Sequence, residues 1–295
     1  MSVIKNKYNN SPTIEKCIKD YQYSFRKDLL RNKIAFITGG GSGICFTIAE
    51  IFMRHGCHTA IAGRNLERLQ TSAKTLTETT GSRCLAVQMD VRKPTEVIEG
   101  IESCLKEYGR IDILINGAAG NFLCPLETMS FNAFKTVIEI DTLGTYNVSK
   151  VAYDKFLKSN GGVIINITAT LHYRGTPLQA HAGAAKAAIE ALTKHQAIEW
   201  GPNGVRVVCV APGPIEDTEG MKKLSMGLST ADIESRIPIG HIGTKQEIGE
   251  ICLFLATDMA RLITSSVVVA DGGSWLTDVN VKKRLEIFKA FTAKM

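Results

Sequence analysis

Seven short apolar runs recur along the chain, separated by longer segments whose apolar positions follow a helical period. The runs are rich in β-branched residues and are continuous instead of alternating, which is typical of strands buried on both faces of a parallel sheet. We expect strands at residues 33–38, 58–62, 83–89, 111–116, 162–168, 205–211 and 267–271.

The segments between these runs predict helices, and several of them end in a glycine suited to the residue after a helix. The clearest helical periods cover residues 43–56, 65–81, 94–109 and 184–201. Strand and helix alternation of this kind predicts an α/β fold of the Rossmann type. We expect one domain with a doubly wound parallel sheet of about seven strands and helices on both faces.

The rest of the chain departs from this rhythm in three places. Residues 1–31 are polar and irregular and are expected to form an arm, so the domain itself covers residues 32–275. Within it, residues 214–244 are rich in glycine, proline and charge, and predict a mobile insertion over the site. Residues 276–295 form a polar tail.

Composition narrows the class of protein. The 295 residues are 44% hydrophobic and 22% charged, with a net charge of +6 that is not clustered, so we do not expect a nucleic-acid partner. No apolar stretch is long enough to predict a membrane anchor or a signal peptide. The eight cysteines show no CxxC spacing, which favours reduced thiols and no metal site.

The first strand runs into a glycine-rich turn that opens a helix. In this context glycines let the backbone approach a pyrophosphate at the helix N-terminus. The turn therefore predicts a dinucleotide site made by Gly39, Gly40, Gly41, Ser42, Gly43 and Ile44.

The end of the second strand indicates which dinucleotide binds. An acidic residue there would bond the ribose hydroxyls of NAD, whereas Arg64, followed by Asn65, suits the extra phosphate of NADP. We therefore expect NADPH, with Asp90 and Val91 at the end of the third strand facing the adenine. Arg92 is assigned to substrate binding, as a charge for a phosphate group.

These motifs together resemble the short-chain dehydrogenase/reductase family over roughly residues 30–275. The resemblance rests on TGGGSGI, Asp90-Val91, NGAAG (116–120), Lys186 and Pro212-Gly213. Longer stretches resemble one branch, the peroxisomal 2,4-dienoyl-CoA reductases, from near residue 20 to the end. They are AEIFMRHGCHT, ILINGAAGNFLCP, SFNAFKTVIEID, NITATL, HAGAAKAA, APGPI and VADGGSWLT.

The resemblance implies further site residues. For the cofactor they are Ala118, Lys186, Pro212, Gly213, Pro214 and Ile215. For the substrate they are Asn121, Phe122, Ser130, Phe131, Asn132 and Lys223. It also implies a homotetramer formed through helices near residues 142–159 and 182–201. The chain departs from the family pattern at Cys45, where a third glycine is usual, and at Val208, where asparagine is usual. It also has Gly117 where asparagine or cysteine is more usual.

The catalytic positions of the family are mostly replaced. Alanine stands at the serine position (Ala169) and at the tyrosine position (Ala182), and Asp141 stands at the asparagine position. Of the usual set only Lys186 is present. A ketone reductase of the ordinary type, which needs the tyrosine to protonate an alkoxide, is therefore not expected.

Reduction of a 2,4-dienoyl-CoA needs a different arrangement. Hydride adds to C5, charge moves to the thioester oxygen, and a proton reaches Cα, so no alkoxide forms at the carbon that receives the hydride. The resemblance implies that Asp141 and Lys186 hold a water for this proton. His181 and Tyr173 remain alternative acids. Another enoyl-thioester reductase, or a degenerate NADP-binding protein, remain alternative functions.

The last three residues, Ala293-Lys294-Met295, resemble a C-terminal peroxisomal signal. Such a signal is read by an import receptor and implies no membrane anchor. A peroxisomal location is therefore expected.

Overall fold

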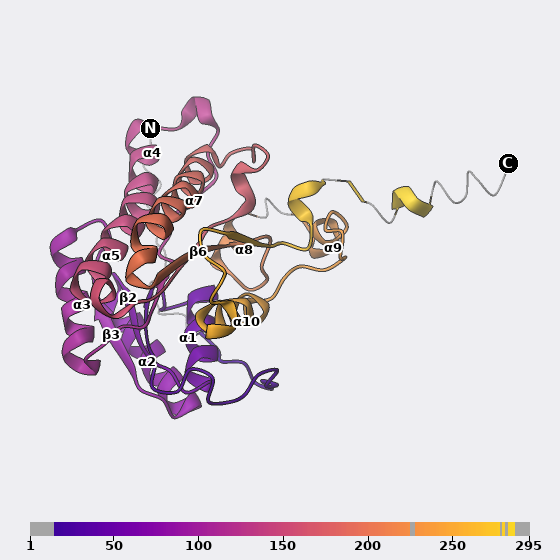
Figure 1. Ribbon diagram of the computed structural model, residues 1–295. Coiled ribbons are helices and arrows are strands. Elements are labelled where there is room, and N and C mark those ends of the chain that lie inside the picture. Colours follow the sequence, from indigo (N-terminus) through magenta and orange to yellow (C-terminus); the bar gives the residue numbers. More distant parts are fainter. Residues whose placement is uncertain (1–14, 225–227, 278, 281–282, 287–295) are drawn as a thin grey trace.

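A single parallel sheet runs through the middle of the protein (Figure 1). The computed structural model describes residues 15–224, 228–277, 279–280 and 283–286. Its seven strands lie in the order β3-β2-β1-β4-β5-β6-β7, and every neighbouring pair is parallel. The strands are β1 (Ile34–Thr38), β2 (His58–Gly63), β3 (Cys84–Gln88), β4 (Ile113–Asn116), β5 (Gly162–Ile167), β6 (Val205–Pro212) and β7 (Val267–Ala270).

The predicted α/β fold is confirmed, and each strand lies where the sequence predicts it, with ends shifted by at most two residues. Burial on both faces explains the continuous apolar runs. In β1, Ile34 and Phe36 belong to the core on one face, whereas Ala35 and Ile37 belong to the core on the other.

Helices cover both faces of the sheet. Helices α1 (Gly43–Arg54), α2 (Leu66–Thr80) and α10 (Lys245–Ala256) pack on one face. On the other face lie α3 (Pro94–Tyr108), α5 (Gly144–Ala152) and α7 (Ala180–Trp200). The remaining helices are α4 (Phe131–Ile138), α6 (Lys158–Asn160), α8 (Glu219–Leu224) and α9 (Thr230–Glu234).

The helix ends follow the expected chemistry. Gly81 and Gly109 end α2 and α3 in the left-handed conformation, with φ of 74° and 75°, as their sequence positions predict. Between α4 and α5 the backbone forms a π-helical turn, η2 (Glu139–Leu143), which carries Asp141. Single π turns inside helices are often found at functional sites.

The described part of the N-terminal arm, from residue 15 onward, is fastened to α1. The carboxylate of Glu50 accepts a hydrogen bond from the backbone amide of Ile18 at 2.9 Å, and Arg54 donates to the carbonyl of Ile18 at 3.0 Å. Glu15 forms an ion pair with Lys245 of α10. The part of the expected arm that the structure describes therefore packs on the body of the same chain.

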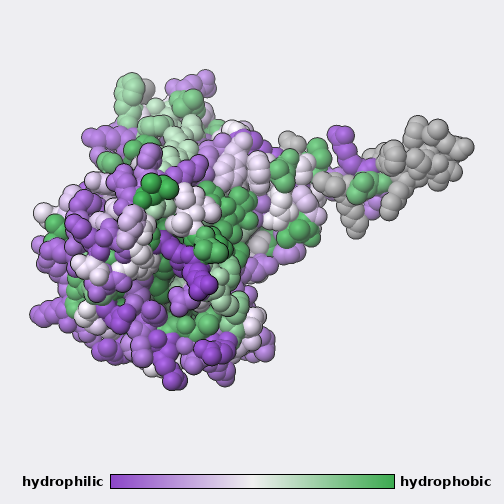
Figure 2. Space-filling model, in the orientation of Figure 1, coloured by the Kyte–Doolittle hydropathy of each residue, from purple (hydrophilic) through white to green (hydrophobic). Residues whose placement is uncertain are grey.

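At the other end, the described residues after η7 (Ser274–Leu276) point away from the body (Figure 1). Figure 2, in the orientation of Figure 1, shows mainly hydrophilic residues along the lower edge of the body, with hydrophobic ones gathered nearer its middle. All eight cysteines are free thiols. Among the described residues, no helix has the length and apolar character needed to cross a bilayer.

Candidate active site

A cavity of about 1200 Å³ opens at the carboxyl ends of the strands, with walls from the loops after β1, β2, β3, β4, β5 and β6. Strand order reverses between β1 and β4, which is where nucleotides bind in folds of this type. Pockets for one ligand usually measure about 300–1,000 Å³, so this cavity has room for a cofactor and part of a substrate.

Most of the residues predicted from the sequence line this cavity. They are Gly39, Gly41, Ser42, Gly43, Ile44, Arg64, Asn65, Asp90, Val91, Ala118, Asn121, Asp141, Lys186, Pro212, Gly213, Pro214 and Ile215. Residues 218–221 of the expected insertion also contribute to the wall, as do Leu228 and Ile233.

The glycine-rich turn is shaped by close backbone approach. Gly39 has φ of 72°, and a β carbon there would lie 2.9 Å from the carbonyl oxygen of Gly117. A β carbon on Gly40 would lie 2.7 Å from the side chain of Ile61, so this glycine packs against β2 and does not line the cavity. The turn thus places the N-terminus of α1 at the cavity, with its first amides outside the helical hydrogen-bond pattern.

Two arginines line the cavity next to the carboxyl end of β2. Arg64 follows β2 and is exposed, as its predicted contact with a phosphate requires. Arg68, four residues later in α2, also lines the cavity, and its buried Nε has no hydrogen-bond partner. The sequence analysis missed Arg68, although a spacing of four on a helix places two residues on one face.

Arg92, which was predicted to contact a phosphate of the substrate, pairs with a carboxylate of its own chain. Its guanidinium bonds both carboxylate oxygens of Asp90, with Nε at 3.0 Å from each. These hydrogen bonds are the main reason why the pKa of Asp90 lies below its ordinary value. Asp90 lines the cavity whereas Arg92 does not, so in this structure Arg92 orients Asp90.

Other predicted substrate residues lie outside the cavity wall. Ser130 accepts a hydrogen bond from the amide of Ala133 and caps α4. Phe131 is 97% exposed, and Asn132 and Phe122 are also at the surface. The side chain of Lys223 and residues Ala293, Lys294 and Met295 fall outside the described parts of the structure.

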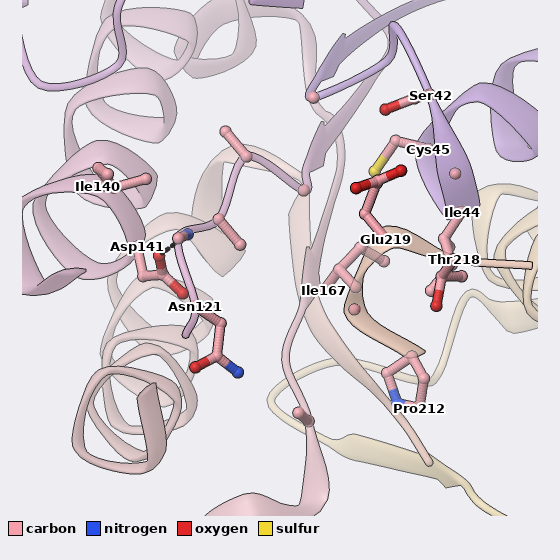
Figure 3. A pocket seen from close by; sticks show the side chains of 18 of the residues that line it. Ser42, Ile44, Cys45, Asn121, Ile140, Asp141, Ile167, Pro212, Thr218 and Glu219 are labelled. Carbon is pink, nitrogen blue, oxygen red and sulfur yellow. Dashed lines mark hydrogen bonds between the residues drawn. The ribbon is translucent and has the colours of Figure 1, made fainter. Parts of the chain in front are cut away.

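The centre of the cavity holds an acid and a base in direct contact. Oδ2 of Asp141 lies 3.1 Å from Nζ of Lys186. Its Oδ1 accepts a hydrogen bond from the amide of Gly120 at 2.7 Å, drawn as a dashed line in Figure 3. Lys186 also donates to the carbonyl of Ile167 at 3.1 Å. Asp141 is 1% exposed and Lys186 is 8% exposed. The fold therefore brings η2, α7 and the loop after β4 together around one buried ion pair.

Small side chains stand beside this pair. Ala169 and Ala182 both line the cavity, so neither the serine nor the tyrosine position offers a hydroxyl there. Elsewhere in the cavity wall, the side-chain amide of Asn121 donates a hydrogen bond to Oε1 of Gln179 at 2.7 Å. Gln179, which the sequence analysis missed, lines the cavity and fixes the orientation of Asn121.

The two alternative acids are placed unfavourably. The hydroxyl of Tyr173 donates to Glu190 at 2.8 Å, and burial together with this carboxylate raises the pKa of the tyrosine well above its usual range. His181 is fully buried against Phe122, with ring centroids 4.2 Å apart, and burial lowers its pKa. Neither residue lines the cavity.

The chain is similar to known proteins over most of its length. The family described as Enoyl-(Acyl carrier protein) reductase matches residues 39–274. A peroxisomal 2,4-dienoyl-CoA reductase [(3E)-enoyl-CoA-producing] of Pongo abelii is 55% identical over 95% of this chain and 96% of its own length. A protein of the same name from Danio rerio is 54% identical over 97% of each chain.

Solved structures give the same fold. A short chain dehydrogenase from Bacillus anthracis superposes with a TM-score of 0.76 and 38% identity, covering 83% of this chain and 97% of that one. A citronellol catabolism dehydrogenase of Pseudomonas aeruginosa PAO1 gives a TM-score of 0.77 at 30% identity, over 86% of this chain and all of that one. The chain belongs to the short-chain dehydrogenase/reductase family.

Proposed function

We propose that the protein reduces 2,4-dienoyl-CoA to 3-enoyl-CoA with NADPH, as part of the breakdown of unsaturated fatty acids. The observation that carries the proposal is the Asp141–Lys186 pair in a cavity where both hydroxyl positions of the family are alanine. The names of the relatives from Pongo abelii and Danio rerio support the same substrate and the same 3-enoyl product.

The residues present fit a phosphorylated dinucleotide. The first amides of α1 face the cavity beside the glycine turn, which suits a pyrophosphate. Arg68 has a buried Nε without a partner, and Arg64 beside it is exposed. Both guanidinium groups would hold the extra phosphate that distinguishes NADPH from NADH.

The chemistry divides between the cofactor and the chain. When bound, the nicotinamide supplies the hydride for C5 of the dienoyl thioester. The carboxylate of Asp141 would accept a hydrogen bond from a water, and the ammonium of Lys186 would polarise that water toward Cα, so that the water delivers the proton. The hydroxide left behind would take a proton from the Lys186 ammonium, which then regains one from solvent. The amide of Gly120 fixes the carboxylate in the orientation that this role needs.

The alanines at 169 and 182 follow from the same chemistry. Hydride transfer to C5 creates no alkoxide at that carbon, so a hydroxyl donor there would have no partner. Small side chains at these positions leave space for the flat conjugated chain beside Asp141. Stabilisation is needed instead at the thioester oxygen, where the negative charge develops.

We also propose that the enzyme is peroxisomal and homotetrameric, with Ala293, Lys294 and Met295 bound by the import receptor. The names of the relatives support the location. A fusion that lacks these three residues is expected to stay in the cytosol of cells without the native protein. Import of the truncated fusion would contradict this part of the proposal.

The activity is tested by following NADPH oxidation with 2,4-hexadienoyl-CoA, 2-hexenoyl-CoA and acetoacetyl-CoA in parallel. We expect turnover with the dienoyl thioester and little with the other two. Preference for 2-hexenoyl-CoA would favour a different enoyl-thioester reductase. Absence of turnover with all three would favour a protein that only binds the cofactor.

A further inference from the structure

The loop after β4 and the first turn of α1 meet at an unusual contact. A β carbon added to Gly117 would meet the sulfur of Cys45 far closer than real β carbons approach any heavy atom. The space next to Gly117 is thus filled by a side chain from another element. Both residues line the cavity.

The backbone does not require a glycine at this position. Gly117 is absent from the residues with positive φ, so its conformation is open to other amino acids. The next nearest atom to the added β carbon is the carbonyl oxygen of Thr38, at 3.2 Å, which is only a tight contact. Cys45 is therefore the main reason why residue 117 carries no side chain.

Cys45 in turn occupies a position that matters for the cofactor. It is the third residue of α1, so its backbone amide belongs to the set that has no partner within the helix. Its side chain is 5% exposed, and burial raises the pKa of its thiol to about 12, so the sulfur acts as an apolar group that packs.

The loop after β4 is anchored at the same place. The amides of Gly117 and Ala118 both donate to the hydroxyl of Thr38, at 3.0 and 3.1 Å. Thr38 ends β1 and directly precedes the glycine turn. The Cys45–Gly117 contact and the Thr38 hydroxyl thus fix the distance between two walls of the cofactor site.

We propose that Cys45 and Gly117 form one positioning unit for the nicotinamide cofactor. The sulfur takes the volume of a side chain at residue 117 and so holds the N-terminus of α1 and the loop after β4 at the separation that the dinucleotide needs. The unit explains how the chain carries a cysteine and a glycine that both depart from the family pattern. This inference rests on the proposed binding of NADPH.

The test is a double-mutant cycle read as the dissociation constant of NADPH, measured from the fluorescence of the nucleotide. Gly117→Ala is expected to weaken NADPH binding by about 10- to 100-fold. This is roughly the change in affinity that corresponds to the usual free-energy cost of overpacking a close-packed site. Adding Cys45→Gly to Gly117→Ala is expected to restore binding to within a few-fold of the wild type, because the space then becomes free.

A matched control separates positioning from general stability. Cys104→Gly also removes a fully buried cysteine from a helix, α3, away from the cavity. It is expected to lower the melting temperature without changing NADPH binding. If Gly117→Ala unfolds, a second double variant, Cys45→Gly with Gly117→Cys, replaces it. This variant moves the thiol from residue 45 to residue 117, so it is expected to bind NADPH within a few-fold of the wild type.

Two results would overturn the inference: wild-type NADPH affinity in Gly117→Ala, or a double variant no better than the single one. Because the readout is binding, these results leave dienoyl-CoA reduction by the wild type untouched. A wild-type protein that binds neither NADPH nor NADH would instead contradict the proposed function along with this inference.

Discussion

The hydroxyl of Tyr173 donates a hydrogen bond to Oε1 of Glu190 at 2.8 Å, and the same carboxylate contacts His172 at 3.1 Å. Glu190 is itself nearly buried, one helical turn after Lys186. Tyr173 was the alternative to the tyrosine that the family uses as an acid. Its hydroxyl is instead hydrogen-bonded to a carboxylate outside the cavity.

We predict that Tyr173→Phe reduces a dienoyl-CoA within a few-fold of the wild-type rate. The raised pKa of Tyr173 opposes loss of its proton near neutral pH, and its hydroxyl does not reach the cavity. Steady-state turnover with saturating NADPH measures this. A loss on the order of 10²-fold or more, the size expected for a positioned acid, would instead place Tyr173 in the proton step.

The preference for NADPH depends on Arg64 in our account. Arg64→Ala is expected to lower NADPH affinity by about 10- to 100-fold, because a charge-assisted bond to the phosphate contributes about 1.5–3 kcal/mol. NADH affinity should stay nearly constant. Arg83→Ala is the matched control, since Arg83 is exposed beside the amino end of β3, paired with Glu107 and away from the cavity. An unchanged ratio of NADPH to NADH affinity would remove Arg64 from this role.

Much of this picture could be predicted from the sequence, because the strands are buried on both faces and so appear as continuous apolar runs. The glycine turn was recognisable from its place between the first strand and a helix, and Lys186 from the family resemblance. Contacts between distant segments could not be found in this way. Nothing in the local sequence shows that Cys45 fills the space beside Gly117, or that Gln179 orients Asn121.

The pairing of Arg92 was also not foreseen. Its charge suggested a phosphate contact, which stays a prediction, and the structure adds a bidentate pair with Asp90 two residues before it. The π-helical turn at 139–143 also has no sequence signature that we could use. Its effect is direct, because it carries the carboxylate that meets Lys186.

Stability is predicted to fall as the pH is lowered from about 7.5 to 5.5, partly through His55. Burial lowers the pKa of His55 in the folded state, whereas the unfolded chain has the ordinary value of about 6.5. The unfolded state therefore binds more protons below this pH, which destabilises the fold. The ring contacts the N-terminal arm, with Nδ1 2.7 Å from the carbonyl of Arg26 and Nε2 2.9 Å from the hydroxyl of Tyr21.

His55→Gln provides the comparison, because glutamine can hydrogen-bond but does not titrate in this range. The melting temperature of the wild type should fall more steeply with decreasing pH than that of His55→Gln. If the melting temperatures of both proteins fall equally with pH, protonation of His55 does not contribute to the loss of stability.

The central claim is that Asp141 acts with Lys186 in the proton step, and Asp141→Asn tests it with little change of shape. Asparagine can still accept the hydrogen bond from Gly120, but it forms no ion pair with Lys186. NADPH binding should therefore remain within a few-fold of the wild type. Lys186→Ala, in contrast, should weaken both NADPH binding and turnover, because the family resemblance gives the lysine both roles.

The most direct measurement is single-turnover reduction of a 2,4-dienoyl-CoA by Asp141→Asn and Asp141→Ala with NADPH saturating. Our account predicts that both variants lose on the order of 10²–10⁴-fold in the rate of product formation, the usual contribution of positioned acid–base catalysis. A near-native rate in either variant, with NADPH bound, would contradict the role of Asp141.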